Sequence, residues 1–387
     1  MQNIQNHIQL LLEELVEKKM EDGLQVAVYL HGQPIVNAYA GLADPVTARP
    51  VDASTLFIGM STTKALTATV IHQLAQAGKL SYDDTIATYW PEFAANGKAG
   101  ITIRQVLCHT AGIPQLSKHV TAAMLLDWDR MIREMEQLKP LWVPGTKTGY
   151  HALTFGWILA EVAQRIDGRP FARIIYEDIS LPLKLGTELF LGVAEQEVPR
   201  IARVNGGTAL IWRFLPNFLL LRKTIPAHLA PMSNPHWDQS AFQRAIIPAG
   251  NAILTANALA RFYAALIGEV DGVCLLSSDQ LARATALQTA APDKVFMGQR
   301  IPKSLGYWLG GSLDVLPALG DIPGVFGHPG TGGLLGFADP AHHLTFALVK
   351  NRLTFRENDT DTRIANAVRK ALGITLHKEE ALAKVSI

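Results

Sequence analysis

Runs of strand-forming residues occur near both ends of this chain, and segments with helical periodicity occupy most of its middle. Near the N-terminus, the runs LQVAVYL (24–30) and PIVNAYAG (34–41) flank a short loop that contains Gly32, which is typical of a β-hairpin. Three more β-like runs follow near the C-terminus, at 306–315, 332–339 and 344–350. We therefore predict an antiparallel sheet formed by N-terminal and C-terminal strands, with helices packed against it.

The helical segments fall into a central block and a set that accompanies the strands. In the central block we predict helices over 62–77, 103–108, 122–138, 153–166 and 171–179. Outside it we predict an amphipathic first helix that ends near Gly23, and helices over 256–266, 278–287 and 362–371. The fold class is therefore α+β, with a sheet domain (1–60 and 248–387) and an inserted, mainly helical domain (61–247).

Charge and composition exclude several classes of partner. The net charge is +1 and no run of Lys and Arg exceeds two residues, so we expect neither nucleic acid nor an anionic membrane as a partner. No clustered Cys/His spacing indicates a zinc site, and we expect no metal and no cofactor. Cys108 and Cys274 are expected to be small buried thiols rather than a disulfide.

The N-terminal segment and the apolar runs bear on location. The first 23 residues lack the charged region, apolar core and cleavage site of a secretory signal. The longest apolar stretch, 209–221, contains Arg213 and Pro216 and is too short to span a bilayer. We expect a cytoplasmic protein without a membrane span, either a monomer or a homo-oligomer.

Ser61 stands three residues before Lys64 at the start of a predicted helix, in the sequence GMSTTKAL. This spacing puts both side chains on one helix face, where the lysine could remove the serine proton. A lysine acts as a base only if burial or a nearby positive charge lowers its pKa, and its neighbours are apolar, with no Asp or Glu between Ser54 and Leu80. The alternative is an ordinary helix start, with Ser61 or Thr62 as N-cap and Lys64 extended into solvent.

Longer blocks of sequence favour the catalytic interpretation. The segments FIGMSTTKALTATVIHQLAQAGKLSYDDTIATYWPEF and ITIRQVLCHTAGIP resemble the serine β-lactamase and penicillin-binding-protein superfamily. They resemble in particular its class C-like branch, which includes the family VIII carboxylesterases, D-amino-acid peptidases and acyl transferases. The resemblance continues at VPGTKTGYHALTFGW, IPAGNAILTANALARFYAAL, LGYWLGG and FGHPGTGGLLGFADP. It implies the β-lactamase/transpeptidase-like fold.

The resemblance also implies roles for individual residues. Ser61 would be the nucleophile, Lys64 the base and Tyr150 a proton shuttle; Lys64, if charged, would make the Tyr150 phenol more acidic. An asparagine is expected two residues after the tyrosine, but this chain has Ala152. His109, in LCHTAG, would be a structural residue that fixes a loop, not a base.

The third motif of the superfamily, Lys-Thr-Gly, is expected on a late strand beside the nucleophile. Lys147 to Gly149 spell it, but they precede Tyr150, so we interpret them as loop residues. The positional equivalent is His328 to Gly330, which would open one strand running through HPGTGGLLGF. By resemblance the N–H groups of Ser61 and Thr331 would form the oxyanion hole, and the glycines would bring the backbone close to the ligand.

A neutral histidine in place of the motif lysine lacks the positive charge that a substrate carboxylate requires, which favours uncharged esters. The alternative is that His328 is a structural histidine at the edge of a strand. We also expect Gly330, Trp212, Phe214 and Phe218 at the substrate, the three aromatic residues as an acyl-binding wall; the alternative for these is core packing or a subunit contact.

The sequence as a whole indicates a serine carboxylesterase that acts on a small-molecule ester through an acyl-enzyme. No Gly-x-Ser-x-Gly elbow is present, which argues against an α/β-hydrolase triad. The alternatives are an acyltransferase, a D-amino-acid peptidase or amidase, or a weak β-lactamase of the same fold. A non-catalytic relative that binds ligands in the old cleft is the alternative from another class.

Overall fold

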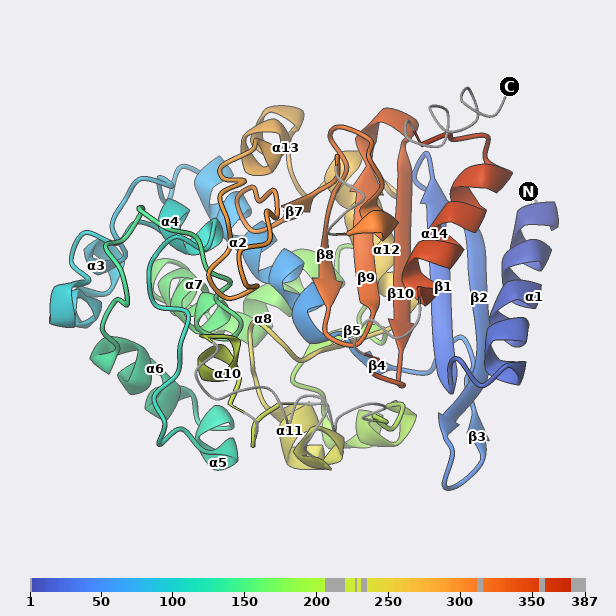
Figure 1. The fold of residues 1–387 in the computed structure, drawn as a ribbon, viewed down its shortest axis with the longest axis horizontal. Helices are drawn as coiled ribbons and strands as arrows, with labels where there is room; N and C mark the ends of the chain where they lie inside the picture. The colour runs from blue at the N-terminus through green and yellow to red at the C-terminus, as the bar shows by residue number, and fades with distance from the viewer. Residues whose placement is uncertain are drawn as a thin grey trace.

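A computed structural model describes residues 2–205, 220–226, 228–230, 235–311, 316–354 and 359–376. Its main feature is an antiparallel sheet of seven strands in the order β3-β2-β1-β10-β9-β8-β7 (Figure 1). The strands are β1 (Gly23–Leu30), β2 (Gln33–Asp44), β3 (Arg49–Pro50), β7 (Trp308–Leu309), β8 (Phe326–Gly330), β9 (Leu334–Asp339) and β10 (Leu344–Lys350). Because β1 pairs with β10, with Val26 opposite Leu348, both ends of the chain form one sheet as predicted.

Helices cover both faces of this sheet. These helices are α1 (Gln2–Glu17), α12 (Ala256–Ile267) and α14 (Thr360–Ala371), while α13 (Ser278–Thr285) packs against α12 and α2. In β9, Gly336 faces Tyr263 of α12, whereas the ring of Phe337 lies 5.0 Å from the guanidinium of Arg369 in α14. Successive residues of a strand point to opposite faces, so α12 and α14 lie on opposite sides of the sheet. All residues of β9 and β10 are therefore buried, without the alternation of a half-exposed strand.

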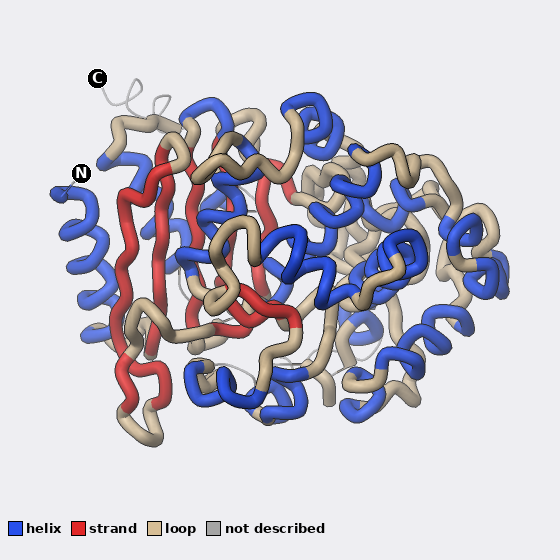
Figure 2. Tube along the Cα trace, turned by 180° about the vertical axis from the view of Figure 1, so that it is seen from behind, coloured by secondary structure: helices blue, strands red, loops and turns tan. Residues whose placement is uncertain are grey.

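The central block is helical, as predicted, and lies beside the β7 edge of the sheet (Figures 1 and 2). Its helices are α2 (Thr63–Gln76), α3 (Ile86–Tyr89), α4 (Ile103–Leu107), α5 (Ala122–Leu125), α6 (Trp128–Gln137), α7 (Thr154–Asp167), α8 (Phe171–Ile175), α10 (Leu220–Thr224) and α11 (Ser240–Arg244). A π-helical turn, Tyr176–Ser180, continues α8. Short 3₁₀ helices connect other elements: η1 (Met60–Thr62), η2 (Pro91–Gly97), η4 (Glu195–Arg200), η6 (Pro235–Asp238), η7 (Pro317–Leu319) and η8 (Pro340–His342).

A second sheet of three short strands was not predicted. It consists of β4 (Phe57–Ile58), β5 (Leu189–Leu191) and β6 (Ala252–Leu254), in the order β4-β6-β5. Phe57 pairs with Leu254, and the N–H of Gly59 donates to the carbonyl of Ala252 at 2.7 Å. This small sheet therefore fixes the chain immediately before Ser61.

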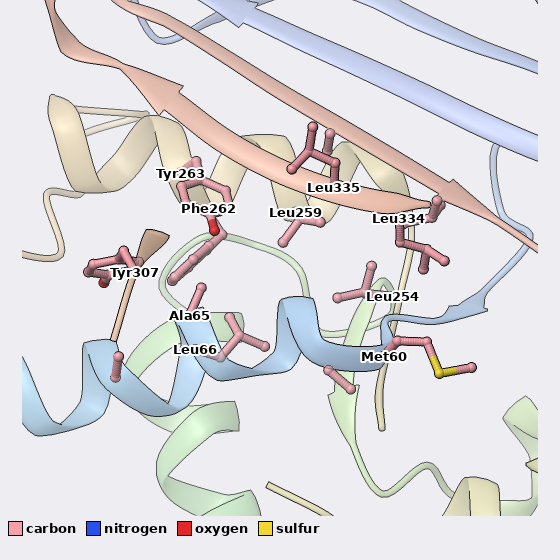
Figure 3. Packing of buried hydrophobic residues seen from close by; sticks show 14 of the residues in the cluster. Met60, Ala65, Leu66, Leu254, Leu259, Phe262, Tyr263, Tyr307, Leu334 and Leu335 are labelled. Carbon is pink, nitrogen blue, oxygen red and sulfur yellow. The ribbon is translucent and has the colours of Figure 1, made fainter. Parts of the chain in front are cut away.

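The start of α2 lies on an apolar layer that separates it from the main sheet (Figure 3). The residues of this layer are buried and come from η1, α2, β6, α12, the loop before β7, and β9. They include Met60, Ala65, Leu66, Leu254, Leu259, Phe262, Tyr263, Tyr307, Leu334 and Leu335. Because this layer encloses the first turns of α2, the polar side chains there lie in a largely dry environment.

Several predicted boundaries were wrong. The predicted helix over 122–138 is two helices, because the Asp127 side chain accepts a hydrogen bond from the N–H of Arg130 and thereby caps a new helix start. The first helix ends at Glu17, and Gly23 begins β1. HPGTGGLLGF is not one strand: β8 ends at Gly330, and a turn precedes β9. The physical reason is the left-handed backbone of Gly332 and Gly333, with φ of +96° and +93°, which a strand cannot contain.

Candidate active site

Ser61 lies in η1, between the small sheet and α2. Ser61 is buried, with 8% of its surface exposed, among neighbours that are also buried. The preceding residue, Met60, has a φ of +48°, in the left-handed region that non-glycine residues rarely adopt. Backbone strain of this kind costs of the order of 1 to 3 kcal/mol and persists only where surrounding packing enforces it.

Lys64 is fully buried, and its Nζ has three oxygen neighbours. It lies 2.7 Å from the carbonyl oxygen of Ala152, 2.9 Å from that of Ala249 and 3.3 Å from the Oγ of Ser61. Burial lowers the pKa of Lys64 well below its usual value. The ordinary helix-start interpretation is therefore wrong: Lys64 does not extend into solvent, and the Thr62 hydroxyl donates to the carbonyl of Gly59 instead of capping α2.

The main chain at Ala249 reaches Lys64 because α7 leaves room for it. A side chain at Gly156 would lie 2.5 Å from the nitrogen of Ala249, so only glycine permits this approach. The Thr67 hydroxyl, one turn after Lys64, donates to the carbonyl of Pro248 at 2.5 Å. The acceptors of Lys64 are thus held by α2 and α7 together.

Tyr150 lies beside this pair and is 6% exposed. The Nζ of Lys64 lies 5.0 Å from the centre of its ring. Burial raises the pKa of Tyr150, and the interaction of the phenol with the Ser61 side chain opposes this shift only in part. The prediction of a more acidic phenol was therefore wrong, because the loss of solvation outweighs the favourable contacts.

Two buried histidines fix the main chain around Tyr150. The carbonyl of His109 accepts a hydrogen bond from the N–H of Gly149 at 3.0 Å. The ring nitrogen Nδ1 of His109 accepts one from the N–H of His151 at 3.1 Å. His151 donates from Nδ1 to the carbonyl of Gly149 at 2.7 Å and accepts at Nε2 from the N–H of Ile113 at 3.1 Å. Burial lowers the pKa of both rings, that of His151 to about 4, so both are neutral near pH 7. His109 thus holds a loop, as expected.

His328 lies in β8 with its ring centre 6.0 Å from that of Tyr150 and 5.6 Å from that of Trp308. Its side chain is fully buried, which the sequence did not reveal. Burial, and secondarily the charge of Lys64, lowers its pKa to about 3, so it is the neutral ring that was expected. Its Nδ1 lies 2.7 Å from the carbonyl of Pro329 and must donate to it, which leaves Nε2 as an acceptor.

Gly330 and Thr331 follow His328 at the end of β8. A side chain at Gly330 would lie 2.8 Å from the Cβ of Leu334 and 3.1 Å from the carbonyl oxygen of Gly59. The end of β8 therefore passes directly beside the segment that carries Ser61. Thr331 is half-buried and begins the turn to β9.

The three aromatic residues predicted to form an acyl-binding wall, Trp212, Phe214 and Phe218, lie outside the described residues. Lys147 is exposed in a loop, as expected for an accidental motif. An aromatic neighbour that sequence reasoning missed is Phe296, whose ring centre lies 5.3 Å from that of Tyr150 and 5.8 Å from that of Trp308.

Among the described residues, no group of three or more His, Cys, Asp or Glu side chains is arranged to hold a metal ion. No helix in the described ranges is both long and apolar enough to cross a membrane. Both cysteines are free thiols; Cys108 is buried as expected, but Cys274 is exposed.

Comparison with known proteins identifies the class. The model of the Beta-lactamase family matches residues 11–369. The esterase/beta-lactamase LipL of Mycobacterium tuberculosis is 36% identical over 348 residues, which cover 86% of this chain and 77% of LipL. A putative D-alanyl-D-alanine carboxypeptidase of Escherichia coli is 26% identical, over 79% of this chain and 71% of that protein.

Solved structures agree with the sequence matches. A family VIII carboxylesterase superposes with a TM-score of 0.85 at 28% identity, over 95% of this chain and 97% of that one. A penicillin-binding protein homologue from Caulobacter crescentus gives a TM-score of 0.84 at 30% identity, with the same coverage. The fold and these matches define a serine hydrolase of the β-lactamase and penicillin-binding-protein superfamily. Within it, the chain belongs to the beta-lactamase family, as the sequence resemblance indicated.

Proposed function

We propose that this protein is a carboxylesterase that works through an acyl-enzyme on Ser61, with Lys64 as the base and Tyr150 as the proton shuttle. The observation that carries the proposal is the environment of Lys64, whose Nζ has two carbonyl oxygens and the Ser61 Oγ as neighbours. A neutral amine has two N–H donors and one lone pair. The carbonyls of Ala152 and Ala249 take the two donors, so the lone pair is left for the Ser61 proton.

The chemical steps follow from these assignments. Ser61 Oγ attacks the ester carbonyl while its proton passes to Lys64, which becomes an ammonium ion. The tetrahedral intermediate collapses, the bond to the alcohol oxygen breaks, and the alcohol takes the Lys64 proton through Tyr150. Water then attacks the acyl group and passes a proton to Lys64. As the bond between the acyl carbon and Ser61 Oγ breaks, Lys64 returns a proton to Oγ, which releases the acid and regenerates both residues.

The raised pKa of Tyr150 suits a relay better than a base. A phenol that stays protonated accepts a proton at its oxygen while it passes its own proton on, so it never has to carry a negative charge in a buried site. We assign the N–H groups of Ser61 and Thr331 to the oxyanion hole. The close passage of Gly330 beside Gly59 supports this, and each such donor is worth about 3 kcal/mol in acyl transfer.

The substrate assignment rests on His328. Because this ring is neutral and buried, it offers no positive charge to a substrate carboxylate, which favours uncharged esters over β-lactams and peptide C-termini. The match to a family VIII carboxylesterase supports the same assignment. We propose that the ester binds between the sheet domain (1–60 and 248–387) and the helical domain (61–247).

β-Lactam hydrolysis is the second candidate, because LipL, at 36% identity, is named both an esterase and a beta-lactamase. The same acyl-enzyme would form by opening of the lactam ring, with Tyr150 delivering the proton to the ring nitrogen. A chromogenic cephalosporin measures this activity directly. The two candidates share Ser61 and differ in the charge that the substrate presents near His328.

The test compares turnover of p-nitrophenyl butyrate by the wild-type protein and by Ser61→Ala. Ser180→Ala is the matched control, because Ser180 is also buried but donates to the carbonyl of Leu189. We expect turnover and fluorophosphonate labelling by the wild type and by Ser180→Ala, and neither by Ser61→Ala. Turnover that survives in Ser61→Ala would exclude Ser61 as the nucleophile, and labelling without turnover of any ester would exclude the esterase assignment.

A further inference from the structure

A fully buried ion pair lies beside the main chain of Tyr150. The Nζ of Lys303 lies 2.8 Å from Oδ2 of Asp293, and their side chains are 1% and 0% exposed. Neither residue has a role in the chemistry proposed above. A buried ion pair rarely adds net stability over apolar residues of similar size, so its presence beside an active site calls for another explanation.

The other carboxylate oxygen of Asp293 binds three main-chain N–H groups. It accepts from Tyr150 at 3.2 Å, from Val295 at 2.8 Å and from Phe296 at 3.1 Å. Two of these donors belong to its own loop, but Tyr150 lies 143 residues earlier in the chain. One carboxylate thus fixes both Tyr150 and Phe296, whose rings lie 5.3 Å apart.

Further contacts join the same two segments. The N–H of Lys294 donates to the carbonyl of Thr148 at 2.9 Å, and the Lys303 Nζ also lies 3.5 Å from the Oγ1 of Thr148. The main-chain carbonyl of Asp293 accepts a hydrogen bond from the N–H of Gly298 at 2.8 Å, and the N–H of Asp293 donates to the carbonyl of Gln299 at 2.9 Å. These two bonds close the loop that carries Asp293. Thr148 and Tyr150 are therefore both bound to a closed loop.

We propose that Asp293 and Lys303 form a positioning pair, in which the Asp293 carboxylate holds the Tyr150 main chain and Lys303 holds that carboxylate. This inference rests on the proposed function of Tyr150 as the proton shuttle. The pair does not touch the reacting atoms. It sets the distance and direction of the phenol relative to Ser61 and Lys64, and a displacement of about 1 Å at such a site lowers the rate by about 100-fold.

The experiment separates the two contributions of the carboxylate. Asp293→Asn keeps an oxygen that accepts the three N–H groups but removes the charge, whereas Asp293→Ala removes both. Turnover of p-nitrophenyl butyrate is expressed per Ser61 labelled by fluorophosphonate, so that unfolded protein is not counted. Lys98→Met is the matched control for Lys303→Met, because Lys98 is also fully buried but binds the carbonyls of Ala95, Glu136 and Leu138.

We expect Asp293→Ala to lower kcat per labelled site by about 100-fold with little change in KM, and Asp293→Asn to lower it less. Lys303→Met leaves a buried carboxylate unpaired and should also lower kcat, and the double variant Asp293→Asn/Lys303→Met should recover part of that loss. Lys98→Met should reduce only the unfolding temperature. If all variants at 293 and 303 keep kcat per labelled site within about twofold of wild type, the pair is merely structural and the proposal is wrong.

A readout independent of esterase activity keeps this inference separate from the proposed function. In protein labelled with 3-fluorotyrosine, the ¹⁹F resonance of Tyr150 is identified among the eight tyrosines by its absence in Tyr150→Phe. We expect this resonance to shift in Asp293→Ala, to shift less in Asp293→Asn and to stay in place in Lys98→Met. If the wild type hydrolyses no ester, the proposed function fails, but this measurement still decides whether the pair positions Tyr150. A Tyr150 resonance that stays in place in both Asp293 variants would overturn the positioning role.

Discussion

The Nζ of Lys64 lies 2.7 Å from the carbonyl oxygen of Ala152, the residue at which the superfamily pattern leads one to expect an asparagine side chain. Lys64 thus contacts the main chain of this residue, and the missing side-chain amide leaves that contact intact. Together with the carbonyl of Ala249, it surrounds Lys64 with uncharged acceptors. The pKa of the amine is accordingly set by burial alone.

Lys64→Met should change how stability depends on pH. The folded-state pKa of Lys64 is lowered, so between that value and the unfolded value of 10.5 the unfolded chain binds one more proton than the folded one. Wild-type stability therefore decreases as pH falls through this window, and Met removes that decrease. We expect Lys64→Met to gain stability relative to wild type as pH is lowered from about 10, measured as the free energy of unfolding in urea.

The control for the loss of a lysine side chain as such is Lys147→Met, at an exposed loop position. A pH-independent difference for Lys64→Met would show that Lys64 keeps its ordinary pKa. In the same variant, kcat for p-nitrophenyl butyrate should fall by about 100- to 10,000-fold, the contribution typical of a general base.

Tyr150→Phe should lower kcat by about 100-fold while the protein stays folded. The variant keeps the ring that packs against His109 and Phe296 and removes only the hydroxyl that relays the proton. Steady-state kinetics on p-nitrophenyl butyrate provide the measurement. Tyr307→Phe is the control, since the Tyr307 hydroxyl is also buried but pairs with Thr69 at 2.9 Å; equal losses in both variants would argue against a relay through Tyr150.

Acid should destabilise this protein through its buried neutral histidines. Burial lowers the pKa of His72 to about 3, and those of His109, His151 and His328 are lowered as well. Below about pH 6.5 the unfolded chain binds protons that the folded chain does not, so stability falls as pH decreases toward 3. Each such histidine contributes a slope of up to about 1.4 kcal/mol per pH unit.

His72→Gln tests this outside the active site, because His72 contacts Tyr82 and the carbonyl of Leu305. Between pH 6 and pH 4 we expect the free energy of unfolding of His72→Gln to fall less steeply with decreasing pH than that of wild type. The difference in slope should correspond to about one bound proton. His7→Gln, at an exposed position, should keep the wild-type slope. Equal slopes in all three proteins would mean that His72 titrates normally in the folded state.

Gly330→Ala should reduce kcat by about tenfold or more, because the added methyl group would lie 3.1 Å from the carbonyl oxygen of Gly59 and separate β8 from the Ser61 segment. Gly100→Ala provides the comparison, since a methyl group there meets no atom within 4 Å among the described residues. Kinetics per labelled Ser61 measure the effect. An unchanged kcat in Gly330→Ala would show that the approach of β8 to Gly59 does not influence catalysis.

The sequence predicted those parts of the site that depend on spacing and residue type. Ser61 and Lys64 are one helical turn apart, and Tyr150 occurs in a segment that resembles the superfamily, so their proximity could be expected. The two carbonyl acceptors of Lys64 could not be predicted, because every residue carries a carbonyl and the direction of each carbonyl depends on tertiary packing. The Asp293–Lys303 pair was missed for a similar reason, since charged residues in a loop are usually exposed.

The fold shows the same division. Strand runs and helical periods predicted the sheet and most helices, because each depends on a local pattern. The break between two helices at Asp127 was missed, because the apolar residues on both sides of it recur at helical spacing. That pattern predicted one helix, although the Asp127 carboxylate caps a new one. The neutral state of His328 followed from residue type, whereas its burial depends on Trp308 and Tyr150, which are distant in sequence.

The order of strands in the main sheet has a consequence for the protein during its synthesis. β1 emerges from the ribosome long before its neighbour β10, which spans Leu344–Lys350. Until those residues emerge, the edge of β1 that pairs with β10 has no partner strand, and contacts between such distant segments form slowly. The nascent chain must therefore keep an apolar strand out of aggregates until β10 has been synthesised, and the main sheet is complete only after Lys350 has left the ribosome.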